Sequence, residues 1–280
     1  MKYYIVDAFT DKPFGGNPAG VVLLDRDVFP QEKLMLQIAA ELRYSETAFV
    51  MRHFEKEFTL RYFTPKAEVE LCGHATIATF AMLNQEVGIN GQCLCHTKAG
   101  DLSIEVGSQV MMQMATPRIV KTVEDTKEIY RALGLENHTP TLPVMIASTG
   151  LPDFMIPLDD VETLNHLHPD MNAISAITER HDAVSFHVFA FSNDGYTAHV
   201  RDFAPLYDIP EESATGTANA ALTHYLQQNG CIPATGDFSF LQGEAMGRPS
   251  VVATRVTPDG TIYVGGTAAI VAKGELTEEA

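Results

Sequence analysis

The amino-acid sequence predicts an α+β protein built from two copies of one structural unit. The first copy contains Arg-x-Phe-x-Pro at residues 61–65 and Gly-x-Ala at residues 73–75, followed by an apolar segment that ends in glycine. The second copy repeats this order at residues 201–205 and 216–218. A shared order of this length indicates internal repetition. We therefore predict two similar units that face each other and share one site.

Length and composition fit this prediction and exclude some partners. The 280 residues suffice for two domains of about 140 residues each. Hydrophobic residues make up 45% and charged residues 20%, as in ordinary globular proteins. The formal net charge of -17 argues against nucleic acid as a partner, because phosphates need a basic surface. An anionic small molecule stays compatible, since backbone amides can make a site locally positive.

Neither a membrane partner nor a metal is expected. No apolar run approaches the roughly 20 residues that cross a bilayer. The first residues lack the features of a signal peptide, so a cytoplasmic location is expected. Cys93 and Cys95, followed by His96, could suggest a metal site. Alternation along a strand instead predicts that both thiols are core residues on one face.

The first half of the chain is expected to contain strands at residues 3–8, 21–24, 45–50 and 58–63, with a helix at 31–43. Asn17 lies in a glycine-rich loop that forms either a simple hairpin turn or a ligand-lining segment. Glu46 lies farther along the chain, where the polar loop after the predicted helix gives way to an apolar strand. Most such glutamates are solvated, but one carried into a cleft would have a raised pKa and could transfer protons.

The two Gly-x-Ala segments are expected to begin helices at residues 77–85 and 219–228. Gly73 would allow close backbone approach, and His74 would lie near free N–H groups that attract an anion. Glu212 and Thr215 could simply cap the second helix. Capping does not explain why both halves carry the same motif.

The remaining elements set the predicted boundaries. Strands are expected at 92–97, 102–106, 110–116, 142–147, 154–158, 184–191, 197–203, 238–241, 250–256 and 262–271, and helices at 123–135 and within 161–180. The first unit then spans residues 1–117, the second spans 118–272, and residues 273–280 form a disordered acidic tail. In an alternative arrangement, the C-terminal strand of the first unit crosses over from the other half.

Four motifs in order resemble the PhzF-like (phenazine biosynthesis) family. They are Asn17-Pro18-Ala19-Gly20-Val21, Ser45-Glu46-Thr47-Ala48-Phe49, Cys72-Gly73-His74-Ala75-Thr76 and Ala214-Thr215-Gly216-Thr217-Ala218. The resemblance implies a diaminopimelate epimerase-like fold, in which each domain is a curved, mostly antiparallel sheet or barrel around a central helix. It also implies a cofactor-free enzyme whose site lies in the cleft between the domains, at the N-termini of both central helices.

The same resemblance assigns roles to individual residues. A family member isomerises trans-2,3-dihydro-3-hydroxyanthranilate; its proton-shuttling glutamate matches Glu46, and its site histidine matches His74. An Asp and a Ser of that site are replaced here by Glu212 and Thr217. The longer side chain at position 212, and the loss of the proline that usually follows it, argue against the phenazine substrate itself.

We therefore expect a cofactor-independent isomerase of a small carboxylate-bearing metabolite, with no metal. Glu46 would be the general acid/base, its pKa raised by desolvation, and His74 and Glu212 would orient substrate or relay protons. The substrate-binding residues would be Asn17, Gly73, Thr215, Gly216 and Thr217.

Two other functions stay open. One is an epimerase or racemase of an amino-acid-like substrate that uses a carboxylate and a histidine as its bases. A two-thiol mechanism is disfavoured, because the second loop offers only threonines opposite Cys72. The other is a non-catalytic binding protein, since fold does not fix function. A homodimer is also compatible, although the sequence indicates no interface.

Overall fold

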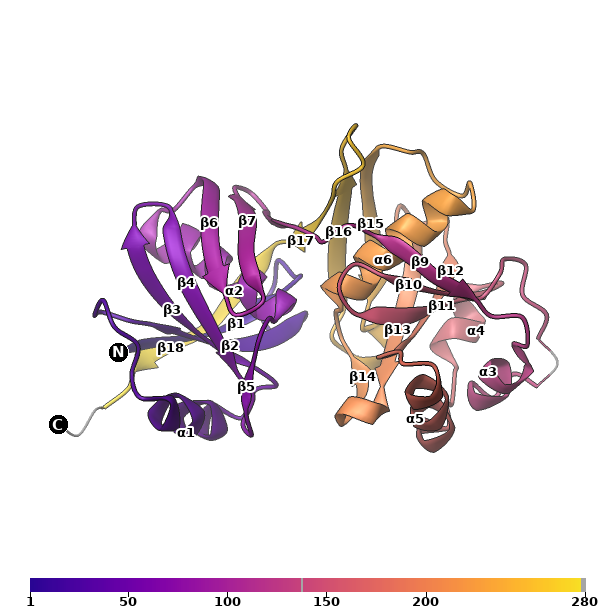
Figure 1. Cartoon of the computed structure of the whole chain (residues 1–280), viewed down its shortest axis with the longest axis horizontal. Helices are drawn as coiled ribbons and strands as arrows, with labels where there is room; N and C mark the ends of the chain where they lie inside the picture. Colours follow the sequence, from indigo (N-terminus) through magenta and orange to yellow (C-terminus); the bar gives the residue numbers. More distant parts are fainter. Residues whose placement is uncertain (137, 278–280) are drawn as a thin grey trace. The chain divides into compact units, whose positions relative to one another are not determined.

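The computed structural model describes residues 1–136 and 138–277 (Figure 1). The chain forms two compact units. The first comprises Met1–Gln113 and the segment that begins at Gly265, and the second comprises Met114–Val264. Each unit has a mixed, mostly antiparallel sheet and one helix that is mostly buried, so the predicted fold class is confirmed.

The first unit is built around helix α2 (Gly73–Val87), in which every residue from His74 to Leu83 is buried. Its strands pair in the order β18-β1-β2-β3-β4-β6-β7-β8, and the short strand β5 also pairs with β4. Only the β2/β3 and β4/β6 pairs are parallel among these. The other elements are β1 (Lys2–Ala8), β2 (Asn17–Leu23), α1 (Glu32–Leu42), β3 (Thr47–Phe54), β4 (Glu57–Phe63), β5 (Glu68–Val69), β6 (Gly91–Thr97), β7 (Gly100–Val106), β8 (Val110–Gln113) and β18 (Ala268–Glu275).

The second unit is built around helix α6 (Gly216–Gln228). Its strands pair in the order β9-β10-β11-β12-β13-β15-β16, and β14 also pairs with β13. The other elements are β9 (Arg118–Thr122), α3 (Lys127–Ala132), β10 (Met145–Ser148), β11 (Pro152–Leu158), α4 (Val161–Asn165), α5 (Met171–Arg180), β12 (Phe186–Phe191), β13 (Ala198–Ala204), η1 (Pro205–Tyr207), β14 (Ile209–Glu212), β15 (Gly236–Gln242), η2 (Glu244–Met246), β16 (Ser250–Val256) and β17 (Ile262–Gly266).

The two units share one topology. In the first unit, β1 and β2 pair antiparallel, β3 adds parallel to β2, β4 pairs antiparallel with β3, and β6 adds parallel to β4 after helix α2. In the second unit, β10, β11, β12, β13 and β15 pair in the same way, with helix α6 before β15. Strand β9 pairs with β10 in the second unit as β18 pairs with β1 in the first. The internal repeat predicted from the two motifs is therefore confirmed as a structural repeat.

The Arg-x-Phe motif has the same structural role in both units. Arg61 lies over the ring of Phe63, with 5.3 Å from Cζ to the ring centroid, and Arg201 lies over Phe203 at 4.9 Å. Each arginine also makes a bidentate ion pair, with Glu68 or with Glu211. Each motif therefore combines a cation–π contact with a charge-assisted fork that holds the next strand.

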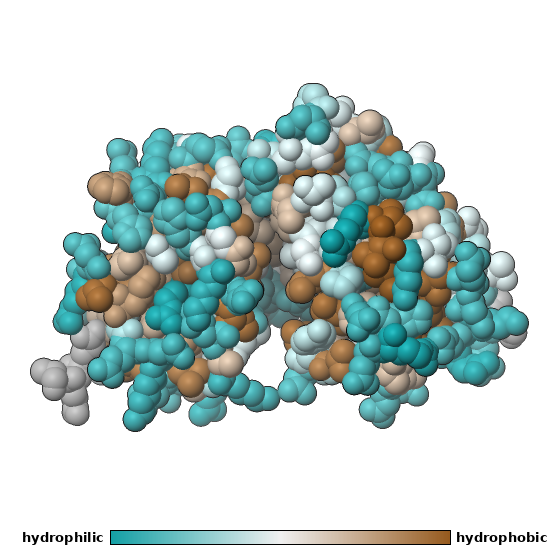
Figure 2. Space-filling model, in the orientation of Figure 1, coloured by the Kyte–Doolittle hydropathy of each residue, from teal (hydrophilic) through white to brown (hydrophobic). Residues whose placement is uncertain are grey.

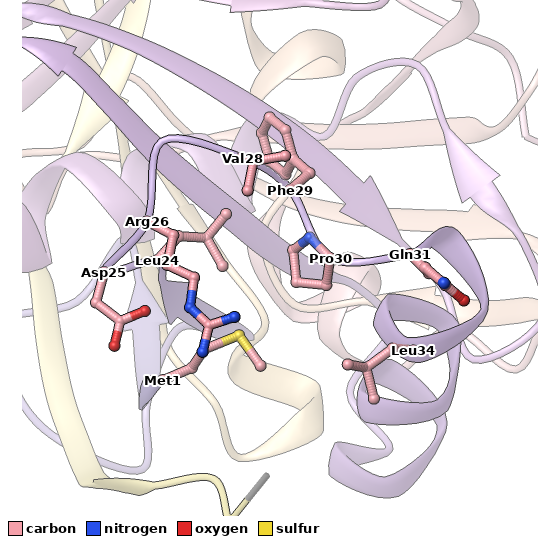
Figure 3. A pocket seen from close by; sticks show the side chains of 9 residues that line it. All are labelled: Met1, Leu24, Asp25, Arg26, Val28, Phe29, Pro30, Gln31 and Leu34. Carbon is pink, nitrogen blue, oxygen red and sulfur yellow. The ribbon is translucent and has the colours of Figure 1, made fainter. Parts of the chain in front are cut away.

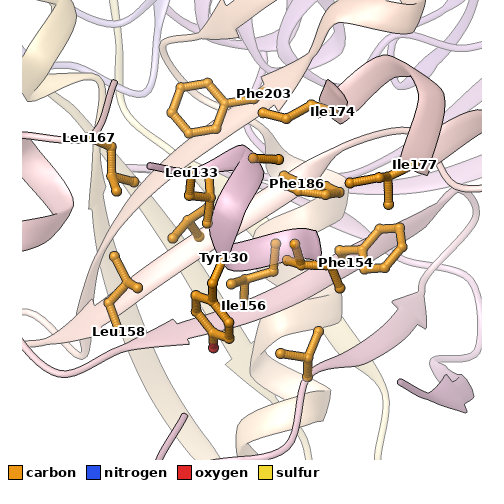
Figure 4. Close-up of a cluster of buried hydrophobic side chains, with 14 of the residues drawn as sticks. Tyr130, Leu133, Phe154, Ile156, Leu158, Leu167, Ile174, Ile177, Phe186 and Phe203 are labelled. Carbon is orange, nitrogen blue, oxygen red and sulfur yellow. The ribbon is translucent and has the colours of Figure 1, made fainter. Parts of the chain in front are cut away.

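The cluster of buried side chains that Figure 4 shows belongs to the second unit and lies between its sheet and helices α3, α4 and α5. Phe154, Phe186 and Phe203 come from three neighbouring strands and point into this cluster. Because side chains alternate along a strand, the residues next to these phenylalanines face the opposite side of the sheet. That opposite side packs against α6.

Several predicted boundaries are wrong. Residue 17 already belongs to β2, so the glycine-rich turn is shorter than expected, and the predicted helix at 123–135 is only Lys127–Ala132. The region 161–180 holds two helices, and the predicted strand 262–271 is divided into β17 and β18. Strands β5, β9 and β14 were not predicted. They are only two to five residues long, too short for a period to be recognised.

The C-terminus also differs from the prediction of a disordered acidic tail at residues 273–280. Lys273, Gly274 and Glu275 belong to β18 and pair with Tyr4, Tyr3 and Lys2 of β1. The last strand therefore adds to the sheet of the first unit, as in the alternative crossover arrangement, whereas the predicted boundary at residue 272 assigned it to the second. Residues 278–280 lie outside the described part of the chain.

Polar side chains cover most of the face that Figure 2 shows, with only scattered apolar groups. Among the described residues, no helix is long and apolar enough to span a membrane.

Candidate active site

The first group of predicted site residues lies where β3 begins and α2 starts. Glu46 immediately precedes β3, and its carbonyl oxygen accepts a hydrogen bond of 3.1 Å from Gly20 N–H of the neighbouring strand. Glycine is required at position 20, because a Cβ there would lie 2.7 Å from Thr47 Oγ1. The close parallel pairing of β2 and β3 thus fixes the backbone that carries Glu46.

Glu46 and His74 contact each other. Glu46 Oε2 lies 3.3 Å from His74 Nε2, and Ser45 Oγ lies 3.5 Å from the same nitrogen. Cys72 Sγ lies 3.5 Å from His74 Nδ1. The side chain of His74 is 7% exposed and that of Glu46 is 17% exposed. The carboxylate is therefore partly accessible, while the imidazole behind it is buried.

Burial lowers the pKa of His74 below its ordinary value, although the nearby charge of Glu46 opposes this effect. His74 is thus neutral at pH 7, with one ring nitrogen a donor and the other an acceptor. A neutral imidazole against a carboxylate can orient it through an N–H···O bond, and it can also take or release a proton.

The start of α2 is held by buried hydroxyl groups. Thr76 Oγ1 donates to the carbonyl oxygen of Cys72 at 2.7 Å, and Tyr62 Oη lies 2.7 Å from Thr76 Oγ1. A Cβ on Gly73 would approach only Met112 Cε, at 3.7 Å, so packing does not require glycine there. The helix N-terminus at Gly73 offers backbone N–H groups and the positive end of a dipole, which favour an anion.

Glu46, Cys72 and His74 could also hold a metal ion, since their ligand atoms all lie within 4.8 Å of one another. A carboxylate, a thiolate and an imidazole suit zinc. The positive end of the α2 dipole opposes a cation at this position, and an anionic ligand fits it better. In the other metal candidate, Cys93 and Cys95 are buried core residues, as predicted, and His96 pairs with Asp101 and Glu57 rather than with the thiols.

The second group of predicted residues lies at the start of α6. Glu212 Oε2 accepts a hydrogen bond of 2.7 Å from Thr215 Oγ1. Thr215 N–H donates to Gln242 Oε1 at 3.1 Å, and Gln242 Nε2 donates to Glu212 O at 2.9 Å. Asn219 Nδ2 also donates to Gln242 Oε1, at 2.8 Å. Gln242 therefore fixes the loop that carries Glu212.

Gln242 and Asn219 were not identified from the sequence. Asn219 is a fully buried polar residue among the alanines of the first turns of α6, a pattern that the sequence shows. Gln242 is the last residue of β15 and gives no such signal, because its partner loop lies 27 residues away in sequence.

The remaining predicted residues have less specific surroundings. Asn17 is buried at the start of β2, opposite Ala8 of β1. The carbonyl oxygen of Thr217 accepts a hydrogen bond of 3.0 Å from Thr149 Oγ1, in the loop between β10 and β11. Gly216 is the buried first residue of α6.

Two surface hollows contain none of the predicted site residues. The first, of about 220 Å³, belongs to the first unit (Figure 3). Its lining residues are Met1, Leu24, Asp25, Arg26, Val28, Phe29, Pro30, Gln31 and Leu34. The second, of about 480 Å³, lies in the second unit beside α4 and is mainly polar. Neither brings an acid/base pair together as Glu46 and His74 do.

Comparison with known proteins relates this geometry to a family. Residues 6–274 match the model of the phenazine biosynthesis-like protein family, PhzC-PhzF. The chain is 33% identical over 300 residues to the uncharacterized isomerase YddE of Escherichia coli (strain K12), covering 99% of each protein. It is 31% identical over 259 residues to trans-2,3-dihydro-3-hydroxyanthranilate isomerase of Pseudomonas chlororaphis, covering 90% of this chain and 89% of the relative.

Solved structures give the same result for the fold. A PhzF family protein of Bacillus anthracis superimposes with a TM-score of 0.87 at 27% identity, covering 99% of each chain. A hydroxyproline epimerase of Agrobacterium vitis matches with a TM-score of 0.63 at 12% identity, covering 98% of this chain and 91% of the other. At 12% identity the second match concerns the fold alone.

Proposed function

Because the chain belongs to the phenazine biosynthesis-like (PhzF) family, we propose that it is a cofactor-independent isomerase that moves a proton within a small carboxylate-bearing metabolite. The class of enzyme agrees with its relatives, which are named isomerases. The observation that carries the proposal is the contact of 3.3 Å between Glu46, which is partly exposed, and a buried neutral His74.

In the proposed reaction, Glu46 is the general acid/base. Its carboxylate removes a proton from a carbon next to an unsaturated or carbonyl group, so that a C–H bond breaks and an O–H bond forms. The released electron pair delocalises into the adjacent π-system. Glu46 then returns the proton to another carbon, and the double bond shifts without net oxidation or reduction. Positioned proton transfer of this kind typically contributes about 10² to 10⁴ in rate.

The substrate carboxylate is proposed to bind at the open helix start of α2. Gly73 leaves that side of the helix unobstructed, and the free N–H groups stabilise negative charge. His74 would hold Glu46 through Nε2, and it would relay a proton when Glu46 is protonated. Negative charge that develops in the transition state would also be stabilised by the helix dipole.

The start of α6 in the second unit is proposed as a further ligand-binding group. Glu212, fixed by Thr215, would hold or relay a proton, and the first turn of α6 with Thr215, Gly216 and Thr217 would bind polar groups. Asn17 would line the substrate site from β2. Glutamate and threonine at positions 212 and 217, where the resemblance puts aspartate and serine, favour a substrate other than the one named for the Pseudomonas relative.

Replacing Glu46→Gln tests this proposal. We expect turnover to fall by about 10³-fold or more while the far-UV circular dichroism spectrum and the melting temperature stay unchanged. Glu57→Gln is the matched control, because Glu57 also contacts a histidine, at 3.1 Å, but on the surface of the same unit. Cys72→Ser should keep most of the activity, because the thiol is not assigned a proton-transfer role.

The assay is best made in D2O with a panel of small unsaturated carboxylates that begins with trans-2,3-dihydro-3-hydroxyanthranilate. Deuterium gained at a new carbon with migration of the double bond supports the isomerase. Exchange at an α-carbon with loss of chirality would instead indicate an epimerase. Wild-type turnover by the Glu46→Gln variant would refute the assigned role of Glu46, and ligand binding without any chemistry would indicate a binding protein.

A further inference from the structure

A buried polar network lies next to Glu212 in the second unit. Asp153 of β11, Ser185, His187 of β12 and Asp202 of β13 are each exposed by 2% or less. Ser185 Oγ lies 2.9 Å from Asp153 Oδ1 and 2.8 Å from Asp202 Oδ1. His187 Nδ1 lies 2.8 Å from the same oxygen of Asp202. The four side chains thus form a continuous chain of hydrogen bonds.

The network faces the central helix of its unit. Asp153, Ser185 and Asp202 each precede one of the phenylalanines that point into the cluster of Figure 4. By strand alternation their side chains lie on the other face of the sheet, which packs against α6. Asp202 is also the cross-strand partner of Glu212 in the β13/β14 pair. The network therefore lies directly behind the proposed proton-transfer group of this unit.

The structural repeat gives the same location. Thr47 pairs with Phe63 in the first unit, and Phe186 pairs with Phe203 in the second. Phe63 and Phe203 occupy the same motif position, so their partners Thr47 and Phe186 correspond to each other. The residues just before these partners are Glu46 and Ser185, so Ser185 occupies the position that Glu46 has in the first unit. The corner of the sheet that carries the proposed catalytic acid in one unit thus carries a buried acid pair in the other.

A count of hydrogen atoms shows that both carboxyl groups cannot be ionised. The Ser185 hydroxyl has one hydrogen, but its oxygen lies within hydrogen-bond distance of two carboxyl oxygens. If both acids were ionised, one of these contacts would bring together two oxygens with no hydrogen between them. A proton on one of the carboxyl groups removes this conflict.

The surroundings assign that proton to Asp153. Asp202 Oδ1 can accept from both Ser185 and His187, which suits an ionised group. Asp153 Oδ2 has no hydrogen-bond partner among the described residues, and a buried charge on such an oxygen would be costly. His187 Nε2 likewise has no partner among them, which suits a neutral ring protonated at Nδ1.

The charges around Asp153 act in the same direction. Burial and the negative charges of Asp202 and Glu212 raise the pKa of Asp153 well above its usual range, against the lowering effect of hydrogen bonds from Ser185. On the other neighbouring strand, β10, the residue opposite Asp153 is Ala147, which carries no charge.

We propose that Asp153 is a protonated acid at neutral pH that donates a hydrogen bond to Ser185. Through this chain of hydrogen bonds, an ionised Asp202 is held beside Glu212. The network carries one negative charge and no cation. It is a positioning device for Glu212, and in that respect the proposal rests on the function proposed for Glu212.

Paired substitutions locate the proton. Asp153→Asn keeps the shape of the side chain and an N–H donor for Ser185, so its melting temperature at pH 7 should equal or exceed that of the wild type. Asp202→Asn removes the charged acceptor of two buried donors, and we expect its melting temperature to fall by about 5 °C or more. Equal damage in both variants would overturn the assignment.

Infrared spectroscopy at pH 7 tests the protonation state directly. The wild type should show the C=O band of a protonated carboxylic acid, and Asp153→Asn should lack it. Because the folded pKa is raised, the stability that protonated Asp153 contributes is complete below about pH 3.9, the pKa of an unfolded aspartate, and declines as the pH rises from there through the folded pKa. Asp153→Asn should lack this decline. Absence of the infrared band in the wild type would contradict the proposal.

The positioning role has its own readout, which is the titration of the Glu212 carboxyl carbon followed by ¹³C nuclear magnetic resonance. Removing the charge of Asp202 should move this titration to lower pH, whereas Asp153→Asn should leave it unchanged. An unchanged titration in Asp202→Asn would refute the positioning role. None of these measurements requires turnover, so failure of the proposed reaction would be recognised separately.

Discussion

Two ionisable side chains contact the imidazole of His74, and their surroundings suit them to different tasks. Glu46 is partly exposed and precedes β3, where its backbone is held by Gly20 of β2, so it can reach a ligand. Cys72 is buried and has no cysteine counterpart at the start of α6, where Thr215 and Thr217 stand. The carboxylate is therefore the better candidate for proton transfer, and a two-thiol mechanism lacks its second thiol.

The burial of His74 predicts how stability depends on pH. Its pKa is lowered in the folded state, so the unfolded chain takes up a proton first as the pH falls. The stability associated with neutral His74 is complete above about pH 6.5 and is lost as the pH falls from there to the folded pKa. We expect urea unfolding midpoints to decline as the pH falls below about 6.5, and His74→Gln to reduce that decline. An unchanged decline in His74→Gln would show that other groups cause it.

These residues were proposed from the sequence because the motifs that resemble the PhzF-like family are short and local. Glu46, His74 and Thr215 belong to short motifs at element boundaries, and the contacts Glu46–His74 and Glu212–Thr215 are now established. The Asp153–Ser185–Asp202 network was not predicted. Its members come from three strands and meet only through the sheet register, which no local pattern encodes.

At the scale of elements, long and strongly patterned segments were predicted and short ones were missed. Helices α2 and α6 follow from apolar segments between a Gly-x-Ala start and a glycine end. Gly88 and Gly230 both have positive φ, at 78° and 69°, as expected where a helix terminates. Strands β5 and β14 depend instead on the ion pairs of the Arg-x-Phe motif, which hold short segments against β4 and β13.

Those ion pairs give a prediction about the two copies of the motif. Arg201 is 9% exposed and donates to Glu211 and also to the carbonyl oxygens of Leu164 and Leu167, whereas Arg61 is 21% exposed. Lysine cannot reproduce a bidentate fork. We expect Arg201→Lys to cost about 2–3 kcal/mol in unfolding free energy and Arg61→Lys about 1 kcal/mol. Chemical unfolding of both variants tests this, and equal costs would contradict the role assigned to burial.

At the scale of the whole molecule, the repeat predicted from sequence explains most of the topology. One feature of the repeat departs from chain order: β18, at the C-terminus, pairs with β1, while the corresponding place in the second unit is filled by β9, from the middle of the chain. The first unit therefore receives the strand next to β1 from the far end of the chain, whereas the second unit receives the strand next to β10 from the residues just before it. The sequence analysis allowed for such a crossover only as an alternative, because β9 and β18 carry no motif in common.

The pairing of β18 with β1 predicts that the C-terminal strand is essential for the first unit. Strand β18 pairs with β1 over its whole length, and Leu276 N–H donates to Met1 O at 2.9 Å. Truncation after Thr267 removes β18 and leaves the buried residues Val6 and Ala8 of β1 without their neighbours. A loss of several kcal/mol is expected, which lowers the melting temperature by about 10 °C or more in a unit of this size.

Truncation after Leu276 is the control, since it keeps every β1–β18 pair and the bond to Met1. It should melt like the full chain in differential scanning calorimetry. Because the second unit contains its own edge strand β9, its transition should persist in both truncated proteins. If the truncation after Thr267 melted like the full chain, β18 would be dispensable. Equal loss of both transitions would mean instead that the second unit cannot fold without β18, although its own sheet is complete.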